Sequence, residues 1–196
     1  DYETRNVIHS AESNQHKGED GRFSYFRSPI RNIMPYKDIT LEDVYKVIVG
    51  PYFEARTKAL RGMMSADGRR VYKANAFDYC TFGGTFGERR AGSLKELSGL
   101  MVLDFDHVRS VEELRDVMKA ETTLDVRLLF RSPSGDGLKA VIGVDVKDAK
   151  EYGEMFDEVR DYMADAYGYE VDRSGRDVCR ACFIPWDPEA VMITKT

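Results

Sequence analysis

Hydrophobic residues recur with different periods along the chain, and these periods predict its helices and strands. Apolar residues at helical spacing over residues 41–48 follow Thr40-Leu-Glu-Asp43, a sequence that resembles a capping box. This pattern predicts a helix that ends at Gly50-Pro51, where a helix is difficult to continue. The same reasoning predicts a strand at 22–26, a second helix at 52–63 that ends before Asp67-Gly68, and a strand leading into a glycine-rich turn at 76–86.

The pattern is clearer in the second half of the chain. The continuous apolar run Leu100–Leu103 is typical of a strand that is buried on both faces. A short turn at 132–137 joins two apolar segments, which we therefore expect to be antiparallel neighbours. The predicted elements are a strand at 100–103, a helix that begins after Ser110, strands at 126–130 and 138–146, a helix at 148–167 that ends at Gly168, and a last strand at 178–184.

The order of these elements predicts the fold class. The succession β-α-β-β-α-β is the ferredoxin-like arrangement that RNA-recognition folds share, so we expect an α+β protein. We divide the chain into a polar flexible arm at 1–21, an N-terminal α/β unit at 22–96 and a ferredoxin-like unit at 97–196.

Composition excludes several classes of protein. The 196 residues are 42% hydrophobic and 32% charged, with a net charge of −5, which is a globular mix and not that of a general polyanion binder. The apolar runs are far shorter than a membrane span, so we expect no membrane partner. Three cysteines exclude a disulfide-dense scaffold and favour a reducing compartment, the cytoplasm.

Charge is unevenly distributed along the chain. Residues 55–90 contain eight basic and three acidic residues, whereas residues 104–170 are acidic. A basic region beside an acidic one fits metal-binding carboxylates that face a phosphate-binding surface. On charge alone, two solvated faces of opposite sign are the simpler explanation.

Two aspartates at the end of a predicted strand are the first candidate for chemistry. Residues i and i+2 of a strand project from one face, so Asp104 and Asp106 are close enough to share a divalent cation. Mg²⁺ or Mn²⁺ suits oxygen ligands and relieves the repulsion between two carboxylates. The alternative is a strand end with two solvated aspartates.

Two further polar segments are candidates for phosphate binding. In the turn before the strand at 138–146, Gly135 and Gly137 allow backbone N–H groups to approach phosphate oxygens, and Ser134 and Lys139 add a hydroxyl and a positive charge. The alternative is an ordinary hairpin turn. The segment 171–180 contains two carboxylates and three arginines, and arginine side chains suit phosphate oxygens. The alternative is a polar loop with local ion pairs.

Together these segments resemble the three motifs of the archaeo-eukaryotic primase (primase–polymerase) superfamily. The motifs are Leu103-Asp-Phe-Asp106, Ser134-Gly-Asp-Gly-Leu-Lys139, and Val171-Asp172 with Arg180 downstream. The chain looks most like the primase-like N-terminal domain of virulence-protein-E-type primase–helicases, which bacterial mobile elements encode. Residues 82–90 are similar to the block that precedes the first motif in that family.

The resemblance implies a nucleotidyltransferase that acts in DNA replication, with a ferredoxin-like catalytic unit packed on an N-terminal α/β unit. Asp104, Asp106 and Asp172 would hold one or two Mg²⁺ or Mn²⁺ ions, and nucleoside triphosphates would be the substrate. Nucleotide phosphates would contact Ser134, Gly135, Gly137, Lys139 and Arg180. A single-stranded DNA template would lie on Arg61, Arg69, Arg70, Arg89 and Arg90. A helicase domain would follow in the same or another chain.

Three alternatives stay open at this point. Lys139 stands where the superfamily usually has histidine, and lysine cannot reproduce the proton chemistry of imidazole, so the domain could instead be an inactive nucleic-acid or replication-complex binding module. Asp177 competes with Asp172 as the third carboxylate. An apolar strand that ends in Asp-x-Asp also fits a haloacid-dehalogenase-like phosphatase, although that motif normally opens a parallel sheet near the N-terminus.

Overall fold

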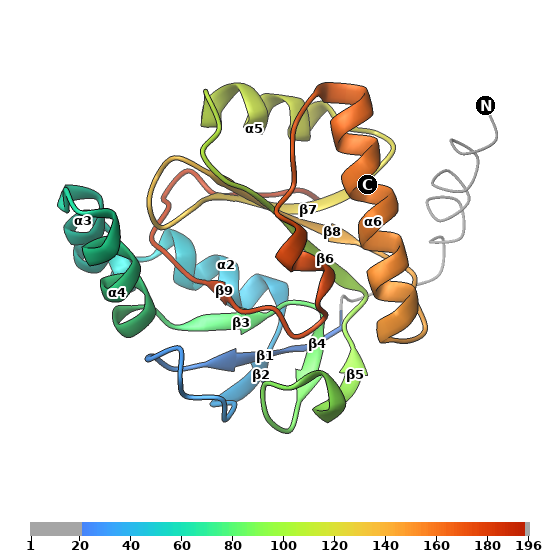
Figure 1. Cartoon of the computed structure of the whole chain (residues 1–196), viewed down its shortest axis with the longest axis horizontal. Helices are drawn as coiled ribbons and strands as arrows, with labels where there is room; N and C mark the ends of the chain where they lie inside the picture. Colours follow the sequence, from blue (N-terminus) through green and yellow to red (C-terminus); the bar gives the residue numbers. More distant parts are fainter. Residues whose placement is uncertain (1–20, 195–196) are drawn as a thin grey trace.

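A computed structural model describes residues 21–194 (Figure 1). The predicted arm at 1–21 therefore lies outside the described residues, except for Gly21. The described part contains two four-stranded sheets and a two-stranded hairpin, and every strand pair in them is antiparallel. Helices accompany both sheets, so the α+β class that the sequence predicts is confirmed.

The N-terminal sheet has the strand order β2-β1-β3-β9. Its strands are β1 (Phe23–Phe26), β2 (Lys37–Ile39), β3 (Tyr79–Thr81) and β9 (Cys182–Phe183). The helices of this half are α2 (Leu41–Val49), α3 (Glu54–Gly62) and α4 (Ala66–Ala76), with a short 3₁₀ turn η1 (Pro51–Phe53) before α3.

Capping residues explain one predicted helix and one unpredicted helix in this half. α2 begins as predicted, because Thr40 and Asp43 form a reciprocal capping box. The helix predicted at 52–63 ends at Gly62, before Asp67-Gly68 as predicted, but the sequence did not predict α4, in whose first turn Asp67 and Gly68 lie. The Ser65 hydroxyl accepts a hydrogen bond from the Gly68 N–H at 3.1 Å, so Ser65 caps a helix at a position where glycine indicates a turn.

The central sheet has the strand order β10-β7-β8-β6. Its strands are β6 (Leu100–Phe105), β7 (Asp125–Arg131), β8 (Leu138–Gly143) and β10 (Val191–Met192). Its helices are α5 (Val111–Ala120) and α6 (Ala149–Tyr167), which Ser110 and Asp148 cap. The hairpin β4 (Gly84–Phe86) and β5 (Leu94–Leu97) and the 3₁₀ turns η2 (Ala91–Ser93) and η3 (Arg173–Arg176) complete the order.

The predicted succession β-α-β-β-α occurs as β6-α5-β7-β8-α6, but the last predicted strand lies elsewhere. Within 178–184 only Cys182 and Phe183 form a strand, and they pair with β3 of the N-terminal sheet through Cys80↔Cys182. The fourth strand of the central sheet is β10, which pairs with β7. The chain therefore adds β9 to the N-terminal sheet before it adds β10 to the central sheet. The predicted unit at 97–196 thus supplies one strand to the sheet of the predicted unit at 22–96.

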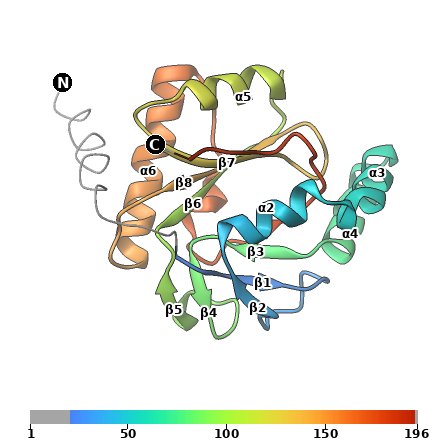
Figure 2. The ribbon, with the colours of Figure 1, turned by 180° about the vertical axis from the view of Figure 1, so that it is seen from behind.

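Two apolar cores lie on opposite faces of the central sheet. The outer core contains Met101, Leu103 and Phe105 of β6 together with the apolar faces of α5 and α6. The inner core contains Leu100 and Val102 of β6 and the N-terminal sheet, with α2 between the two sheets (Figure 2). The alternation along β6 therefore directs Asp104, like Leu100 and Val102, towards the inner side.

Replacement of Leu128 by alanine is expected to show how much stability the inner core supplies. Leu128 is fully buried in this core, so Leu128→Ala should lower the free energy of unfolding by about 2–5 kcal/mol through lost burial and a cavity. Val71→Ala, on the exposed side of α4, is the control and should change stability by less than about 0.5 kcal/mol. Equal urea midpoints for both variants would contradict this assignment of the core.

Candidate metal centre

Antiparallel pairing of β6 with β8 places Asp104 directly opposite Lys139. The Lys139 ammonium donates a hydrogen bond to Asp104 Oδ2 at 2.6 Å, and its side chain is 9% exposed. Burial alone would lower the pKa of Lys139, but Cys182 and the Asp104 carboxylate more than offset this and hold the pKa above its usual value. Lys139 therefore lies on the inner side of β8 as a charged partner of Asp104.

Asp172, which comes from the C-terminal part of the chain, lies beside Asp104. The backbone N–H of Asp172 donates to the Asp104 carbonyl oxygen at 2.8 Å, which anchors the start of η3 beside β6. Asp172 Oδ1 accepts a hydrogen bond from the Ser174 N–H at 2.9 Å. Figure 1 shows η3 next to β6, between the central sheet and β9.

Asp104, Asp106 and Asp172 form what we call the aspartate cluster. Each residue offers one carboxylate oxygen, and these oxygens lie within 4.8 Å of one another. Asp177 is not among the grouped carboxylates, and its carboxylate instead accepts a hydrogen bond from the Cys179 N–H at 3.0 Å. Of the two candidates for the third carboxylate, the structure thus brings Asp172 to the site.

The charges in the cluster are only partly compensated. Partial burial and the neighbouring Asp104 carboxylate raise the pKa of Asp106. Burial would also raise the pKa of Asp172, but hydrogen bonds from Ser174 and the charge of Arg180 outweigh it and hold the pKa below its usual value. Asp104 Oδ1 is buried and has no hydrogen-bond partner among the described residues.

This donor set fits a divalent cation that prefers oxygen ligands. Three carboxylates share one ammonium, so the ionised cluster carries net negative charge. A cation with the oxygen preference of Mg²⁺ or Mn²⁺ would offset that charge and give Asp104 Oδ1 a partner. Asp104, Asp106 and Asp172 are the residues that would hold it.

The backbone N–H groups of the turn at 132–137 form hydrogen bonds within the turn itself. The Gly137 N–H donates to the Ser132 hydroxyl at 3.1 Å, and the Gly135 N–H donates to the Ser132 carbonyl oxygen at 3.0 Å. Both N–H groups, which the sequence assigned to phosphate, thus have partners within the turn. Gly135 has a φ of +89°, and a Cβ on Gly137 would lie 2.5 Å from the Phe105 carbonyl oxygen, so both positions require glycine. Ser134 is half-buried in the same turn.

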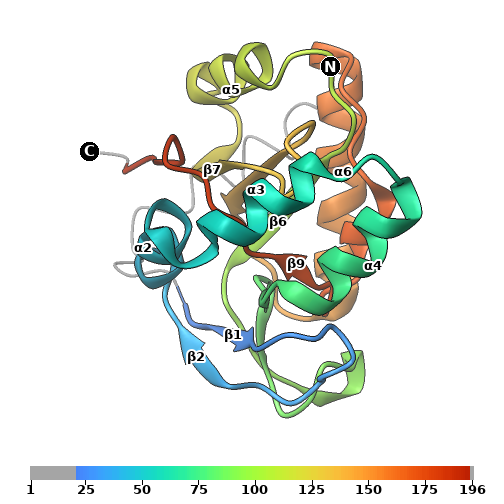
Figure 3. The same cartoon turned by 90° about the vertical axis from the view of Figure 1, so that its left-hand side faces the viewer.

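Arg61 on α3 holds this turn, a contact that the sequence did not predict. Its guanidinium donates to the carbonyl oxygens of Ser132 and Pro133, both at 3.2 Å. Figure 3 looks onto α3 and α4, with β6 and β9 behind them. The positive charge of Arg61 within a basic segment indicated only a template contact, whereas the structure gives it a positioning role.

The other predicted template residues have separate local partners. Arg89 donates to the Tyr79 hydroxyl at 3.1 Å and to the Ile30 carbonyl oxygen, so it ties the hairpin β4–β5 to the N-terminal sheet. Arg69 donates to the Met63 carbonyl oxygen at 3.3 Å. Arg70 and Arg90 are exposed and form surface ion pairs with Asp67 and Glu88. Arg180 is exposed beyond η3.

Replacement of Lys139 by methionine is expected to reveal its role as the partner of Asp104. Lys139→Met removes the ammonium and leaves a largely buried carboxylate without compensation, which should cost about 3 kcal/mol at neutral pH. The double variant Lys139→Met/Asp104→Asn should recover most of this loss in urea unfolding. Additive losses in the double variant would show that the two groups do not interact.

Replacement of Asp106 by asparagine is expected to change how stability depends on pH. Because the folded-state pKa of Asp106 is raised, its ionised form is disfavoured in the folded protein, so this residue costs stability once the pH exceeds its pKa in both states. In metal-free buffer, Asp106→Asn should therefore melt at a higher temperature than wild type at pH 7. The difference in melting temperature between the variant and wild type should narrow as the pH falls towards 4. A gap that widens on acidification would contradict the raised pKa.

Comparison with known proteins places the chain in a family. The family model for the BT4734-like N-terminal domain matches residues 72–192, a segment that includes all three members of the aspartate cluster. Neither the search of curated proteins nor the search of solved structures gives a match. Among the described residues, none of the helices has the length and apolarity that a membrane span needs. Because the match covers more than half of its residues, the chain belongs to the BT4734-like N-terminal domain family.

Proposed function

We propose that this domain is a metal-dependent nucleotidyltransferase of the primase–polymerase type. The observation that carries the proposal is the aspartate cluster, in which three carboxylate oxygens lie within 4.8 Å and one buried oxygen of Asp104 lacks a partner. When bound, a divalent cation supplies positive charge for phosphate oxygens and lowers the pKa of an attacking hydroxyl group. The substrates in this proposal are nucleoside triphosphates and a single-stranded DNA template.

The surrounding residues have distinct tasks in the proposal. Lys139 orients the Asp104 carboxylate through the 2.6 Å hydrogen bond to Oδ2. The Ser174 N–H fixes Asp172 at the start of η3. Arg61 and Arg180 are exposed cations beside the turn at 132–137 and beside Asp172, where they would contact phosphates of the nucleotide or template. A helicase domain in the same or another chain and a role in mobile-element replication belong to the same proposal.

The sheet topology argues against a haloacid-dehalogenase-like phosphatase. The strand that carries Asp104 lies at an edge of an all-antiparallel sheet and pairs only with β8 among the described strands. The phosphatase interpretation needs a parallel sheet. A binding module without catalysis is the second candidate, because the Lys139 ammonium occupies one oxygen of Asp104.

Primer synthesis by matched variants is the test of this proposal. Wild-type protein with Mn²⁺, a single-stranded template and labelled nucleotides should form extended products. Asp104→Asn and Asp106→Asn should reduce the rate by roughly 100-fold or more, because each removes a metal ligand. Asp177→Asn is the control, since Asp177 lies in the same segment as Asp172 but outside the cluster.

Calorimetry separates the two candidate functions. Mn²⁺ binding that is present in wild type and Asp177→Asn but absent in Asp104→Asn, without any product, would favour the binding module. If wild-type protein binds no Mn²⁺ and forms no product, the nucleotidyltransferase proposal is wrong.

A further inference from the structure

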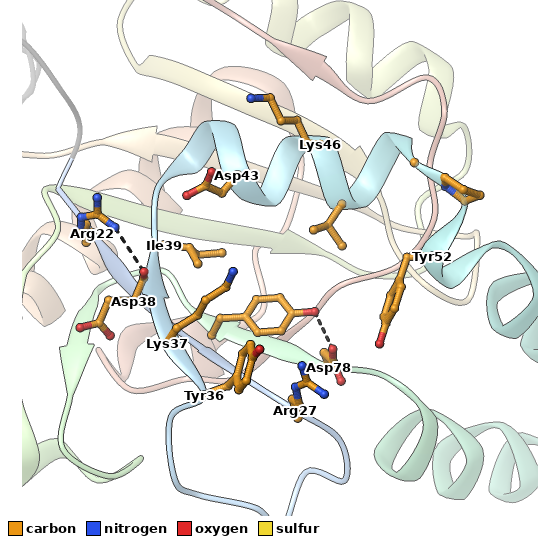
Figure 4. A pocket seen from close by; sticks show the side chains of 14 residues that line it. Arg22, Arg27, Tyr36, Lys37, Asp38, Ile39, Asp43, Lys46, Tyr52 and Asp78 are labelled. Carbon is orange, nitrogen blue, oxygen red and sulfur yellow. Dashed lines mark hydrogen bonds between the residues drawn. The ribbon is translucent and has the colours of Figure 1, made fainter.

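A pocket of about 700 Å³ lies between α2 and the β1–β2 hairpin (Figure 4). Its volume is typical of sites that bind small molecules. The residues that line it come from positions 22–52 and from Asp78, and they include no member of the aspartate cluster. The proposed nucleotidyl transfer does not use this pocket.

Two tyrosine rings in the pocket are unusually exposed. Tyr36 and Tyr52 are 54% and 61% exposed, although large aromatic side chains are usually more buried. The Tyr52 ring packs against Phe53 in a T-shaped arrangement, with the ring centres 4.7 Å apart. In Figure 4 they lie on either side of Arg27 and Asp78. The Arg27 guanidinium lies 3.9 Å from the centre of the Tyr36 ring. Exposed aromatic rings of this kind are platforms on which planar ring systems stack.

The pocket is lined by charged side chains of both signs. Arg22, Arg27, Lys37 and Lys46 line it together with three aspartates. Each aspartate already accepts hydrogen bonds within the fold, and Lys46 pairs with Glu42 at 3.0 Å. Arg27 and Lys37 have no carboxylate partner within 4.0 Å in the described part of the chain. These two exposed cations are the groups of the pocket that would bind an anionic part of a ligand.

The side chain of Asp78 lies between the two tyrosine rings of the pocket (Figure 4). The Asp78 carboxylate is only 5% exposed and accepts hydrogen bonds from the Tyr25 hydroxyl at 2.6 Å and from the Ser28 N–H at 2.8 Å. An ionised carboxylate has about four acceptor positions, so Asp78 has capacity for a further donor. An N–H group on the edge of a stacked ring matches that capacity.

We propose that this pocket binds a nucleotide. Its base stacks on Tyr52, because the Arg27 guanidinium already covers the Tyr36 ring, and directs an N–H group to Asp78. Its phosphate lies on Arg27 and Lys37. A free nucleoside phosphate and one nucleotide of a single strand present the same chemistry. Binding here needs no metal, so it is separable from the aspartate cluster.

Binding in EDTA is the test, because EDTA removes any metal-dependent binding. Two probes distinguish the two sources: dTMP in isothermal titration calorimetry, and fluorescein-labelled oligothymidylate in fluorescence anisotropy. Tyr52→Ala should weaken binding at least about five-fold, whereas Tyr52→Phe, which keeps the ring, should bind like wild type. Lys37→Glu should weaken binding, and its charge-matched control Lys119→Glu, on the exposed side of α5, should not.

The outcomes assign or reject the site. Weakened binding of dTMP in both Tyr52→Ala and Lys37→Glu assigns the pocket to free nucleotides, and the same result for oligothymidylate alone assigns it to a strand. Binding of neither probe, or wild-type affinity in either variant, overturns the proposal. Asp104→Asn should leave the EDTA result unchanged, so failure of the metal site and failure of this pocket are distinguishable.

Discussion

The register between β6 and β8 is the constraint on which the candidate metal centre depends. It places Asp104 opposite Lys139, and the 2.6 Å hydrogen bond between their side chains compensates one of the three carboxylate charges. A shift of β6 by one residue would turn Asp104 towards the outer core, where α5 and α6 pack, and would leave Lys139 on the inner side. The apolar residues on both faces of β6 fix this register, so packing of the two cores also determines the geometry of the site.

A backbone hydrogen bond completes the site from a distant part of the chain. The N–H of Asp172 donates to the carbonyl oxygen of Asp104, and a few residues later the chain enters the N-terminal sheet as β9. The two sheets are therefore connected through the segment that carries the third carboxylate.

Local patterns predicted most of the longer elements but not α4 or the short strands β2, β5 and β10, and long-range pairing was not predictable from them. The capping residues Thr40, Ser110 and Asp148 and the left-handed Gly168 mark helix ends in the sequence and in the structure. The two-residue strands β9 and β10 have too few residues to show a period, and their partners lie far away in sequence. The strand at 178–184 was therefore placed in the wrong sheet.

For the candidate metal centre, too, local patterns were informative and long-range contacts were not. The spacing of Asp104 and Asp106 on an apolar strand indicated their common direction, and the resemblance supplied Asp172, which the structure brings beside them. Sequence could not show that Gly135 and Gly137 direct their N–H groups into their own turn, or that Arg61 bonds to its carbonyl oxygens. The Arg61 contact depends on how α3 packs against the turn. The tyrosine pocket was also missed, because Tyr36 and Tyr52 come together only in the folded chain.

The most direct measurement is the anomalous scattering of a crystal soaked with Mn²⁺. The account predicts a peak about 2.1 Å from carboxylate oxygens of Asp104, Asp106 and Asp172, near the distance that Mg²⁺-like cations adopt. A soaked crystal with no peak at these oxygens, or with manganese bound only elsewhere, would contradict it.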